Sequence, residues 1–374
     1  MSGGLKDRKQ KHLEICLDRS AGIETGSTGL GSIGLHHRAL PGTRSADADL
    51  TTEFLGYGLA LPIMISCMTG GSEDGRRLNG ILAEAAGRTG IAIGTGSIRV
   101  MMEHPETKPH FQFKLRAPGS PVLANIGAAQ LTEYSPERVL DAASSIDADG
   151  LCIHLNPAQE FFQSGGDRDF TAWRGGIERI LDAAARRGIP VIVKETGAGI
   201  PPSEGLWLLE SGAAYVDIAG AGGTDWIAVE SLRAEGGAGE ASSSFSGWGY
   251  ATGNLLLAYR QIVRAGGESG RHVAGRIIAS GGLRTPRDFA VSLACGAHLA
   301  AAALPFIRRA SEGGLDAVIA YIGAVAEGIA AGITLTGAGN LASFRESELR
   351  LPPDMAATAE TLAEEALSMR GDSK

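Results

Sequence analysis

Short apolar runs recur along the chain, and segments of helical character separate most of them. Such runs are typical of buried strands, and their alternation with helices indicates a parallel sheet covered on both faces. The eight runs are Leu61–Ser66, Ile91–Gly94, Val122–Ile126, Leu151–Leu155, Val191–Glu195, Tyr215–Ala219, Arg276–Ser280 and His298–Ala303. The helical segments include Asp74–Thr89, Pro136–Ile146, Arg174–Arg187 and Pro286–Ala294. Eight such units over about 250 residues predict an α/β fold, the (β/α)8 TIM barrel. A doubly wound open sheet is the alternative.

The rest of the chain divides around this barrel. We predict an amino-terminal arm over residues 1–50, the barrel over residues 51–350 and a peripheral, helical tail over residues 351–374. One connection, Arg233–Gly247, is rich in Gly, Ser and Ala and too long for a simple turn. Long connections of this kind often cover active sites, so we expect this segment to be mobile over the site.

Charge and composition exclude several classes of function. The net charge of −8 and the absence of a basic run argue against a nucleic-acid partner. The start of the chain is polar and basic, unlike a secretory signal. Phe289–Ile307 and Ala317–Leu335 are apolar, but the first holds His298 and Pro305 and the second holds Glu327, so both are expected in the core rather than in a membrane.

The four cysteines, Cys16, Cys67, Cys152 and Cys295, stand far apart without metal-binding spacing. This pattern favours reduced thiols and a cytoplasmic protein.

Polar or Gly-rich clusters follow seven of the eight runs. These clusters are Met68–Gly71, Thr95–Arg99, Asn125, His154–Glu160, Lys194–Glu195, Gly220–Thr224 and Gly281–Arg284. The carboxyl ends of barrel strands share one face, where such enzymes keep their active sites. The sequence therefore predicts one site built from many strands.

The stretch His154–Glu160 is the most informative of these clusters. It places His, Asn, Gln and Glu side chains at the end of a buried strand. Because Pro157 cannot continue the strand, we expect Gln159 and Glu160 to project from a loop. Glu160 suits Mg²⁺, which takes one or two carboxylates and completes its shell with phosphate oxygens and water. The cluster therefore predicts a site for a metal-bound polyanion.

Glycines after the sixth and seventh runs, with the small residues Ala300–Ala303, suggest a phosphate cradle. Without a Cβ, backbone N–H groups can approach phosphate oxygens, and a following helix adds a favourable dipole. Thr224 adds a hydroxyl and Arg284 a charge.

Five further basic side chains are candidate site residues. Lys194 ends an apolar strand, where it could stabilise negative charge on a bound ring, or be neutralised by Glu195 or Glu230. Arg8 and His12 share one helix face with Lys9 beside them, and this face could bind an anion or be merely solvated. Arg99 is better placed to bind phosphate with its planar guanidinium.

With these residues considered, the chain resembles type 2 isopentenyl diphosphate isomerase, the flavin-dependent kind, over roughly residues 6–350. The matching motifs are Arg8-Lys9-x-x-His12, Met68-Thr69-Gly70-Gly71, Gly96-Ser97-Ile98-Arg99, Asn125, His154–Glu160, Lys194-Glu195, Gly222-Gly223-Thr224, Trp248-Gly249 and Ser280–Arg284. The run His154–Glu160 is the most specific to that family, whereas other FMN barrels share the glycine motifs.

The resemblance implies an FMN across the barrel mouth and a diphosphate substrate beside it. FMN would be contacted by Cys67, Met68, Thr69, Ser97, Asn125, Lys194, Thr224, Gly282, Leu283, Arg284, Ala303 and Leu304. Substrate would be contacted by Arg8, Lys9, His12, Ser97, Ile98, Arg99, His154, Asn156 and Gln159, so the arm would contribute to the substrate site. Glu160 would bind Mg²⁺, and the catalytic residues would be Gln159, His154 and Lys194.

Three positions depart from the family pattern. Ile98 stands where Gln is usual, Ala219 where Ser is usual, and Gly249–Thr252 where Gly-Ile-Pro-Thr is usual, so that Ala251 replaces Pro. These departures put one polar substrate contact and one flavin-side hydroxyl in doubt and predict a looser loop. None removes a charge, so we expect activity to survive.

The reaction implied is a 1,3-proton shift from isopentenyl to dimethylallyl diphosphate, for which reduced FMN supplies acid–base chemistry and stabilises positive charge. NADPH would keep FMN reduced, and a homo-oligomer, tetramer or octamer, is expected by analogy. Two alternatives are an FMN-dependent 2-hydroxy acid oxidase or dehydrogenase and a non-catalytic protein that binds flavin or prenyl diphosphate. The first needs a His base near the flavin, and no His follows the sixth or seventh run.

Overall fold

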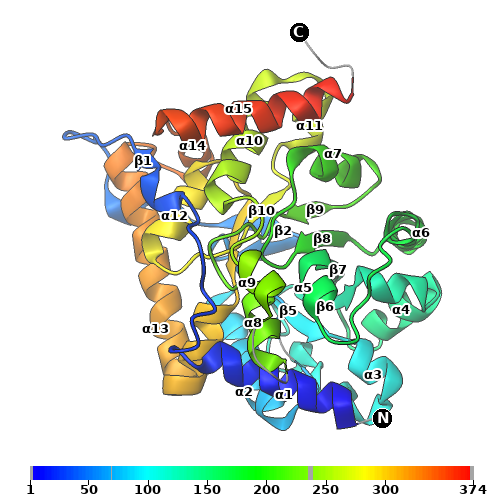
Figure 1. The fold of residues 1–374 in the computed structure, drawn as a ribbon. Coiled ribbons are helices and arrows are strands. Elements are labelled where there is room, and N and C mark those ends of the chain that lie inside the picture. The colour runs from blue at the N-terminus through cyan, green and yellow to red at the C-terminus, as the bar shows by residue number, and fades with distance from the viewer. Residues whose placement is uncertain (1–2, 69, 235–238, 371–374) are drawn as a thin grey trace.

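A closed barrel of eight parallel strands forms the centre of the molecule (Figure 1). The computed structural model describes residues 3–68, 70–234 and 239–370. In chain order the barrel strands are β4 (Ile63–Ile65), β5 (Ala92–Ser97), β6 (Val122–Gly127), β7 (Gly150–Leu155), β8 (Val191–Glu195), β9 (Tyr215–Asp217), β10 (Ile277–Ala279) and β11 (Leu299–Ala302). Each strand pairs with the next, and β11 closes the barrel on β4. All eight predicted runs are strands, and the (β/α)8 fold is confirmed.

Helices connect successive strands along the chain, and most of them cover the outside of the barrel. They are α2 (Glu73–Thr89), α3 (Arg99–Glu103), α4 (Pro136–Ser144), α5 (Pro157–Phe162), α6 (Trp173–Arg186), α7 (Pro202–Glu210), α8 (Trp226–Arg233), α9 (Glu240–Ser244), α10 (Thr252–Ala265), α11 (Gly267–Val273), α12 (Pro286–Ala294) and α13 (Leu304–Thr336). Beyond them lie α14 (Leu341–Arg345) and α15 (Pro353–Ser368), and α15 packs on α10 and α7. The four predicted helical segments correspond to α2, α4, α6 and α12.

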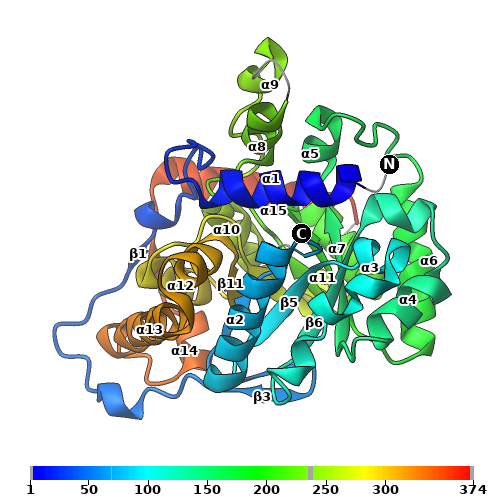
Figure 2. The same cartoon turned by 90° about the horizontal axis from the view of Figure 1, so that it is seen from below.

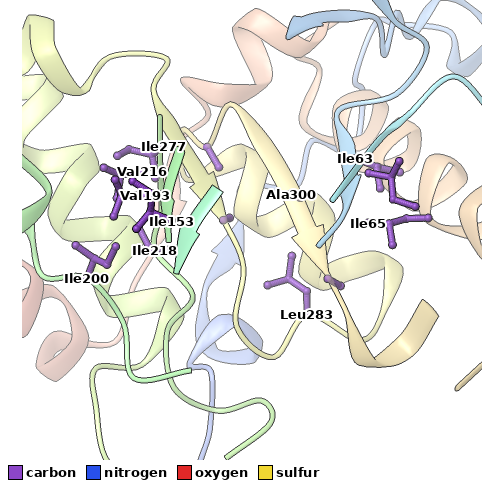
Figure 3. Close-up of a cluster of buried hydrophobic side chains, with 14 of the residues drawn as sticks. Ile63, Ile65, Ile153, Val193, Ile200, Val216, Ile218, Ile277, Leu283 and Ala300 are labelled. Carbon is purple, nitrogen blue, oxygen red and sulfur yellow. The ribbon is translucent and has the colours of Figure 1, made fainter. Parts of the chain in front are cut away.

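Side-chain alternation along the strands separates two cores. Met64, Leu123, Cys152, Ile192 and Ile278 point into the barrel and form its interior cluster with Leu299 and Ala301. The residues between them point outward and pack under the helices, as Figure 3 shows for Ile63, Ile65, Ile153 and Val193. Successive side chains of a strand point to opposite faces. Every second residue on the carboxyl side of the interior cluster must therefore also face into the barrel, and this alternation determines which side chains reach the site.

The two ends of the barrel are closed differently. At the amino-terminal end, the hairpin of β2 (Thr52–Phe54) and β3 (Tyr57–Leu59) places Phe54 against Tyr215 and His298. At the carboxyl end, α1 (Gly3–Leu17) lies across the barrel, with α8 and α9 beside it (Figure 2). Further along the arm, β1 (Gly34–Leu35) pairs with β12 (Leu349–Arg350).

The two apolar segments belong to the barrel shell. Phe289–Ile307 contains most of α12, all of β11 and the start of α13. Ala317–Leu335 lies within α13, the one helix among the described residues that is long and apolar enough to cross a membrane. This helix is kinked at Gly314, and it packs on α12 and α2 through a buried face that includes Val325 and Ile329.

Two local predictions are corrected by the structure. Gln159 and Glu160 project from the short helix α5 rather than from a loop, because Pro157 occupies its first position, where a missing N–H costs no hydrogen bond. The segment Arg233–Gly247 is not a continuous loop either, because Glu240–Ser244 forms α9. Residues 235–238 of that segment lie outside the described residues.

Candidate functional site

A layer of polar side chains lies directly above the apolar interior of the barrel. Five members of the interior cluster are each followed, two residues later along the chain, by a polar residue. Met64, Leu123, Cys152, Ile192 and Ile278 are followed in this way by Ser66, Asn125, His154, Lys194 and Ser280. Asp217 occupies the equivalent place on β9, two residues beyond Tyr215. The repeat of two therefore brings side chains from six strands together at the barrel mouth.

A cavity of about 570 Å³ lies above this layer, beneath α1. Its lining includes most of the residues that the sequence singled out: Arg8, Lys9, His12, Cys67, Met68, Ser97, Arg99, Asn125, His154, Asn156, Gln159, Glu160, Lys194, Thr224, Gly282, Arg284, Ala303 and Leu304. Residues of the arm and residues from the carboxyl ends of the barrel strands therefore line the same cavity.

Two of the predicted contacts among the described residues are not in this lining. The side chains of Ile98 and Leu283 are fully buried in the core under the helices, where Figure 3 shows Leu283. An Ile at position 98 therefore packs away from the cavity, so its side chain cannot supply the substrate contact expected of that position. Thr69 lies outside the described residues.

Glu160 and its neighbours form the end of the cavity that suits a cation. Glu160 Oε1 accepts a hydrogen bond from Asn156 Nδ2 at 3.2 Å, and Oε2 accepts one from the Asp167 backbone N–H at 3.0 Å. The buried Asn156 Oδ1 has no hydrogen-bond partner among the described residues, so it is available to a ligand.

This end of the cavity offers a cation one carboxylate and one amide oxygen. Within the described residues no group of three or more His, Cys, Asp or Glu side chains is arranged to hold a metal ion. The donors fit Mg²⁺ only if phosphate oxygens and water complete its shell, as is usual for this ion.

Glu230, at the buried side of α8, orients Gln159. Glu230 Oε1 accepts a hydrogen bond from Gln159 Nε2 at 2.9 Å and lies 2.9 Å from His12 Nε2, while Oε2 accepts from Arg233 Nε at 2.8 Å. Burial raises the pKa of Glu230, but the contacts with His12, Gln159 and Arg233 together hold it below its ordinary value. The amide of Gln159 is thus fixed between Glu230 and Asn156, whose Nδ2 donates to its oxygen at 3.1 Å.

Among the described residues, Lys194 forms an ion pair with neither of the carboxylates that the sequence suggested, Glu195 and Glu230. The Glu195 carboxylate instead accepts backbone N–H groups from the turn that follows it, Thr196 to Gly199. Lys194 Nζ donates to the carbonyl oxygen of Glu195 at 2.6 Å, and its strand neighbour is Asp217. Burial raises the pKa of Asp217, and the nearby Lys194 ammonium opposes that rise. Asp217 is therefore a buried carboxyl group close to Lys194, and the sequence did not single it out.

His154 is neutral in this site. Burial lowers the pKa of His154 to about 3, and the Lys194 and Lys9 ammonium groups contribute to the same shift. Its Nδ1 lies 3.0 Å from Asn125 Oδ1, an acceptor, which assigns the proton to Nδ1 and leaves Nε2 as an acceptor. At neutral pH His154 can therefore orient or accept a proton, but it cannot serve as an acid.

The basic residues of the arm lie close to Arg99. Lys9 Nζ donates to the Ser97 carbonyl oxygen at 3.3 Å, and Arg99 Nε donates to Glu103 at 2.7 Å. Burial lowers the pKa of Lys9 to about 7, and the Arg8 and Arg99 guanidiniums contribute to the shift. Three cations held together at one end of a cavity, one of them readily deprotonated, indicate a site that attracts a multivalent anion.

This arrangement predicts proton uptake on anion binding. Near pH 7.5 a large share of Lys9 is deprotonated, and a bound diphosphate favours its ammonium form, so binding must raise the pKa and draw a proton from solution. Calorimetric titration of isopentenyl diphosphate with Mg²⁺, repeated in buffers of different ionisation enthalpy, should therefore show net proton uptake. Lys9→Arg, which stays protonated, is the control. An equal uptake by Lys9→Arg and the unmodified protein would contradict the prediction.

The opposite end of the cavity suits a phosphate group. The loops after β9 and β10 pack so closely that a Cβ on Gly223 would lie 2.4 Å from Gly282 N, and one on Gly281 would lie 2.1 Å from Gly220 O. Only glycine permits this approach, which leaves backbone rather than side chains facing the cavity. Helix α13 begins at Leu304 beside these loops, and no side chain caps it. A helix amino terminus of this kind favours an anion.

Ser66 lines the cavity, although the sequence did not single it out. Its side chain is buried at the end of β4, and its Oγ has no hydrogen-bond partner in the described part of the chain. The inward position of residue 66 follows from that of Met64, but only a closed barrel makes this position part of the site. Gln163, Asp167 and Trp226 also line the cavity without having been predicted.

The remaining departures from the family pattern are accommodated locally. Ala219 lines the cavity with a left-handed backbone (φ 37°) and offers no hydroxyl. The segment with Ala251 is not free of its surroundings, because Tyr250 N donates to Ala198 O at 2.9 Å and Ala221 N donates to Tyr250 O at 2.8 Å. These two bonds hold the segment between the loops after β8 and β9.

Comparison with solved structures agrees with the fold. A flavocytochrome b2 variant matches with a TM-score of 0.63 at 15% identity, covering 94% of this chain and 84% of that one. A mandelate oxidase variant with the monooxide FMN adduct matches with a TM-score of 0.57 at 15% identity, covering 90% and 93%. At this identity the likeness concerns the fold alone.

Comparison of sequences is more specific, although no family model matches the chain. An isopentenyl-diphosphate delta-isomerase of Methanococcoides burtonii is 37% identical over 346 residues, 91% of each chain. One of Stutzerimonas stutzeri is 38% identical over 348 residues, 92% of this chain and 97% of the other. One of Metallosphaera sedula is 37% identical over 351 residues, 92% of each chain. The resemblance found in the sequence is confirmed, and the chain belongs to the isopentenyl-diphosphate delta-isomerase family.

Proposed function

We propose that this protein converts isopentenyl diphosphate to dimethylallyl diphosphate by a 1,3-proton shift, with FMN bound at the glycine loops and Mg²⁺ on the substrate diphosphate. One observation supports this most directly. The phosphate-type end, with Gly282 and the start of α13, and the cation-type end, with Glu160 and Asn156, open into the same cavity. One pocket can therefore hold a phosphorylated cofactor beside a metal-neutralised diphosphate.

The residues present fit these two groups. Thr224, Gly282 and Arg284 would hold the FMN phosphate beside α13, and Asn125 and Lys194 would contact the ring from the polar layer. When bound and reduced, FMN supplies the proton transfer and the stabilisation of positive charge that an isolated alkene requires. The buried Ser66 Oγ and Asn156 Oδ1, both without partners among the described residues, are consistent with a site shaped for ligands.

The chain's own residues would bind, orient and exclude water. Arg8, Lys9, His12 and Arg99 would hold the diphosphate, and Glu160 its Mg²⁺. Gln159, fixed by Glu230 and Asn156, would place its amide against the alkene end of the substrate. Neutral His154 would accept a hydrogen bond at Nε2. Helix α1 covers the mouth and would keep water out during the reaction.

The test is anaerobic incubation of the purified protein with FMN, a reductant, Mg²⁺ and isopentenyl diphosphate, with products identified by NMR. We expect dimethylallyl diphosphate to form, and to form only with both reductant and Mg²⁺. Parallel incubation with a lactate-like 2-hydroxy acid in air tests the oxidase alternative through hydrogen peroxide. Flavin binding without any product would instead favour the non-catalytic alternative.

We further propose NADPH as the reductant, a cytoplasmic location and a homo-oligomer, tetramer or octamer. The four cysteines are free thiols, which is consistent with a reducing compartment. Anaerobic bleaching of the flavin by NADPH and sedimentation of the holoprotein would test the reductant and the assembly.

A further inference from the structure

Glu24 lies in the arm between α1 and β1 and binds two arginines from different parts of the barrel. Its Oε1 accepts a hydrogen bond from Arg284 Nε at 2.5 Å, and its Oε2 accepts one from Arg308 Nη1 at 2.6 Å. Arg284 lines the cavity directly after the glycines of the β10 loop, and Arg308 lies in α13. A single carboxylate of the arm therefore joins two elements of the phosphate-type end.

The same arginine holds a second point of the arm. Arg308 Nε donates to the carbonyl oxygen of Cys16 at 3.1 Å, next to the last residue of α1. Arg308 is buried, with 8% of its side chain exposed, while Glu24 keeps 35% of its side chain exposed. Arg308 is therefore placed to fix both the end of α1 and the segment that follows it.

Backbone contacts extend this attachment to the glycine loops. Glu24 forms an antiparallel bridge with Thr224, and Asp225 N donates to the Ile23 carbonyl oxygen at 2.7 Å. Thr28 packs so tightly that a Cβ on Gly282 would lie 2.3 Å from its Cγ2. The arm thus forms a wall of the phosphate-type end as well as a cover over the cation-type end.

Two guanidiniums, those of Arg284 and Arg308, share the Glu24 carboxylate. The Asp18 carboxylate also interacts electrostatically with Arg308. Although burial raises the pKa of Glu24, Arg284 and Arg308 hold it below its ordinary value, so Glu24 is ionised at neutral pH. Loss of this charge would remove the carboxylate that is hydrogen-bonded to the buried Arg308 and would release the arm from α13.

We propose that Glu24 is a positioning residue that couples the arm to the phosphate-type end of the cavity. By holding Arg284 and Arg308 together, it fixes α1 so that Arg8, Lys9 and His12 reach the cavity. The inference rests on the proposed function, in which these three residues bind the substrate diphosphate. The coupling itself is a property of the arm and can be measured without turnover.

The test compares Glu24→Gln with Glu312→Gln in the full-length, FMN-loaded protein. Glu312 is a matched control, because it also pairs with an arginine of the arm, Arg19 at 2.8 Å, but both side chains are more than half exposed. Exposed pairs contribute little, so Glu312→Gln should behave as the unmodified protein does. Glu24→Asp keeps the charge with a shorter reach and should give an intermediate result.

Hydrogen–deuterium exchange of peptides covering residues 8–28 reports on the arm, with barrel peptides as an internal reference. For Glu24→Gln we expect exchange in the arm to rise about tenfold while the barrel is unchanged. The KM for isopentenyl diphosphate should rise about tenfold with kcat within about threefold, because the loss concerns substrate binding.

Unchanged arm exchange in Glu24→Gln, equal effects of Glu24→Gln and Glu312→Gln, or a fall in kcat at constant KM would overturn the proposal. If the unmodified protein failed to isomerise the substrate, the proposed function would fall, while the exchange comparison would still decide the role of Glu24.

Discussion

Replacing Glu160 by Gln should abolish Mg²⁺-dependent isomerisation while FMN stays bound. Glu160 is the carboxylate at the cation-type end of the cavity, and the described residues there provide no cluster of acidic or His ligands that could replace it. Changes outside the ligand shell of a metal already cost about 10–100-fold, so loss of the ligand itself should exceed about a hundredfold. The measurement is the initial rate as a function of Mg²⁺ concentration, with the flavin absorbance recorded on the same sample.

The matched control is Asp167→Asn. Asp167 also lines the cavity, but its carboxylate accepts a hydrogen bond from Trp173 Nε1, and only its backbone N–H contacts Glu160. This variant should keep most of its Mg²⁺ response. Normal turnover by Glu160→Gln would show that the metal assignment is wrong, whereas loss of FMN from that variant would mean that Glu160 shapes the cofactor site as well.

Replacing Lys194 by Ala should sharply weaken FMN binding. Lys194 lines the cavity from the polar layer, and a hydrogen bond from a charged donor contributes about 1.5–3 kcal/mol, so FMN affinity should fall about tenfold to a hundredfold. Removal of the ammonium also takes a favourable charge away from the buried Asp217, which should further raise the pKa of that carboxyl group. Titration of the apoprotein with FMN, followed by flavin fluorescence, measures the change.

Two further variants separate cofactor binding from stability. Lys194→Met combined with Asp217→Asn removes both charges, so it should recover stability but not FMN affinity. Lys114→Ala removes another largely buried lysine, which pairs with Asp149 at 2.7 Å near the amino-terminal end of the barrel. It should lower stability and leave FMN affinity unchanged. A fully loaded, yellow Lys194→Ala protein would refute the assignment.

Much of the fold and of the site could be predicted from local patterns in the sequence. Short apolar runs that alternate with helical segments favour parallel strands buried on both faces, and the carboxyl ends of parallel barrel strands share one edge. Glycines, His154, Lys194 and Glu160 stood at those ends, where few structural roles explain them. Among the described residues, every predicted site residue except Ile98 and Leu283 lines one cavity for that reason.

Tertiary structure decided which side chains face one another. The family resemblance placed position 98 in the substrate site, yet the Ile98 side chain turns into the core, where its apolar surface leaves water. The carboxyl group opposite Lys194 in the sheet is that of Asp217, which lies on the adjacent strand and not beside Lys194 in the chain. Glu195 was the nearer candidate in sequence, but its carboxylate is taken by the backbone of the turn that follows.

The sequence by itself determined the barrel, the edge that carries the site and the chemical types gathered there, because strand periodicity and residue chemistry are local properties. Only the folded chain decided the ion pairs and the cover of the cavity. Glu24 meets Arg284 and Arg308 across about 260 and 284 residues of chain, and Gln159 meets Glu230 across 71. Such pairings form only when the closed barrel brings distant loops together. No local pattern in the sequence predicts which of these residues will meet.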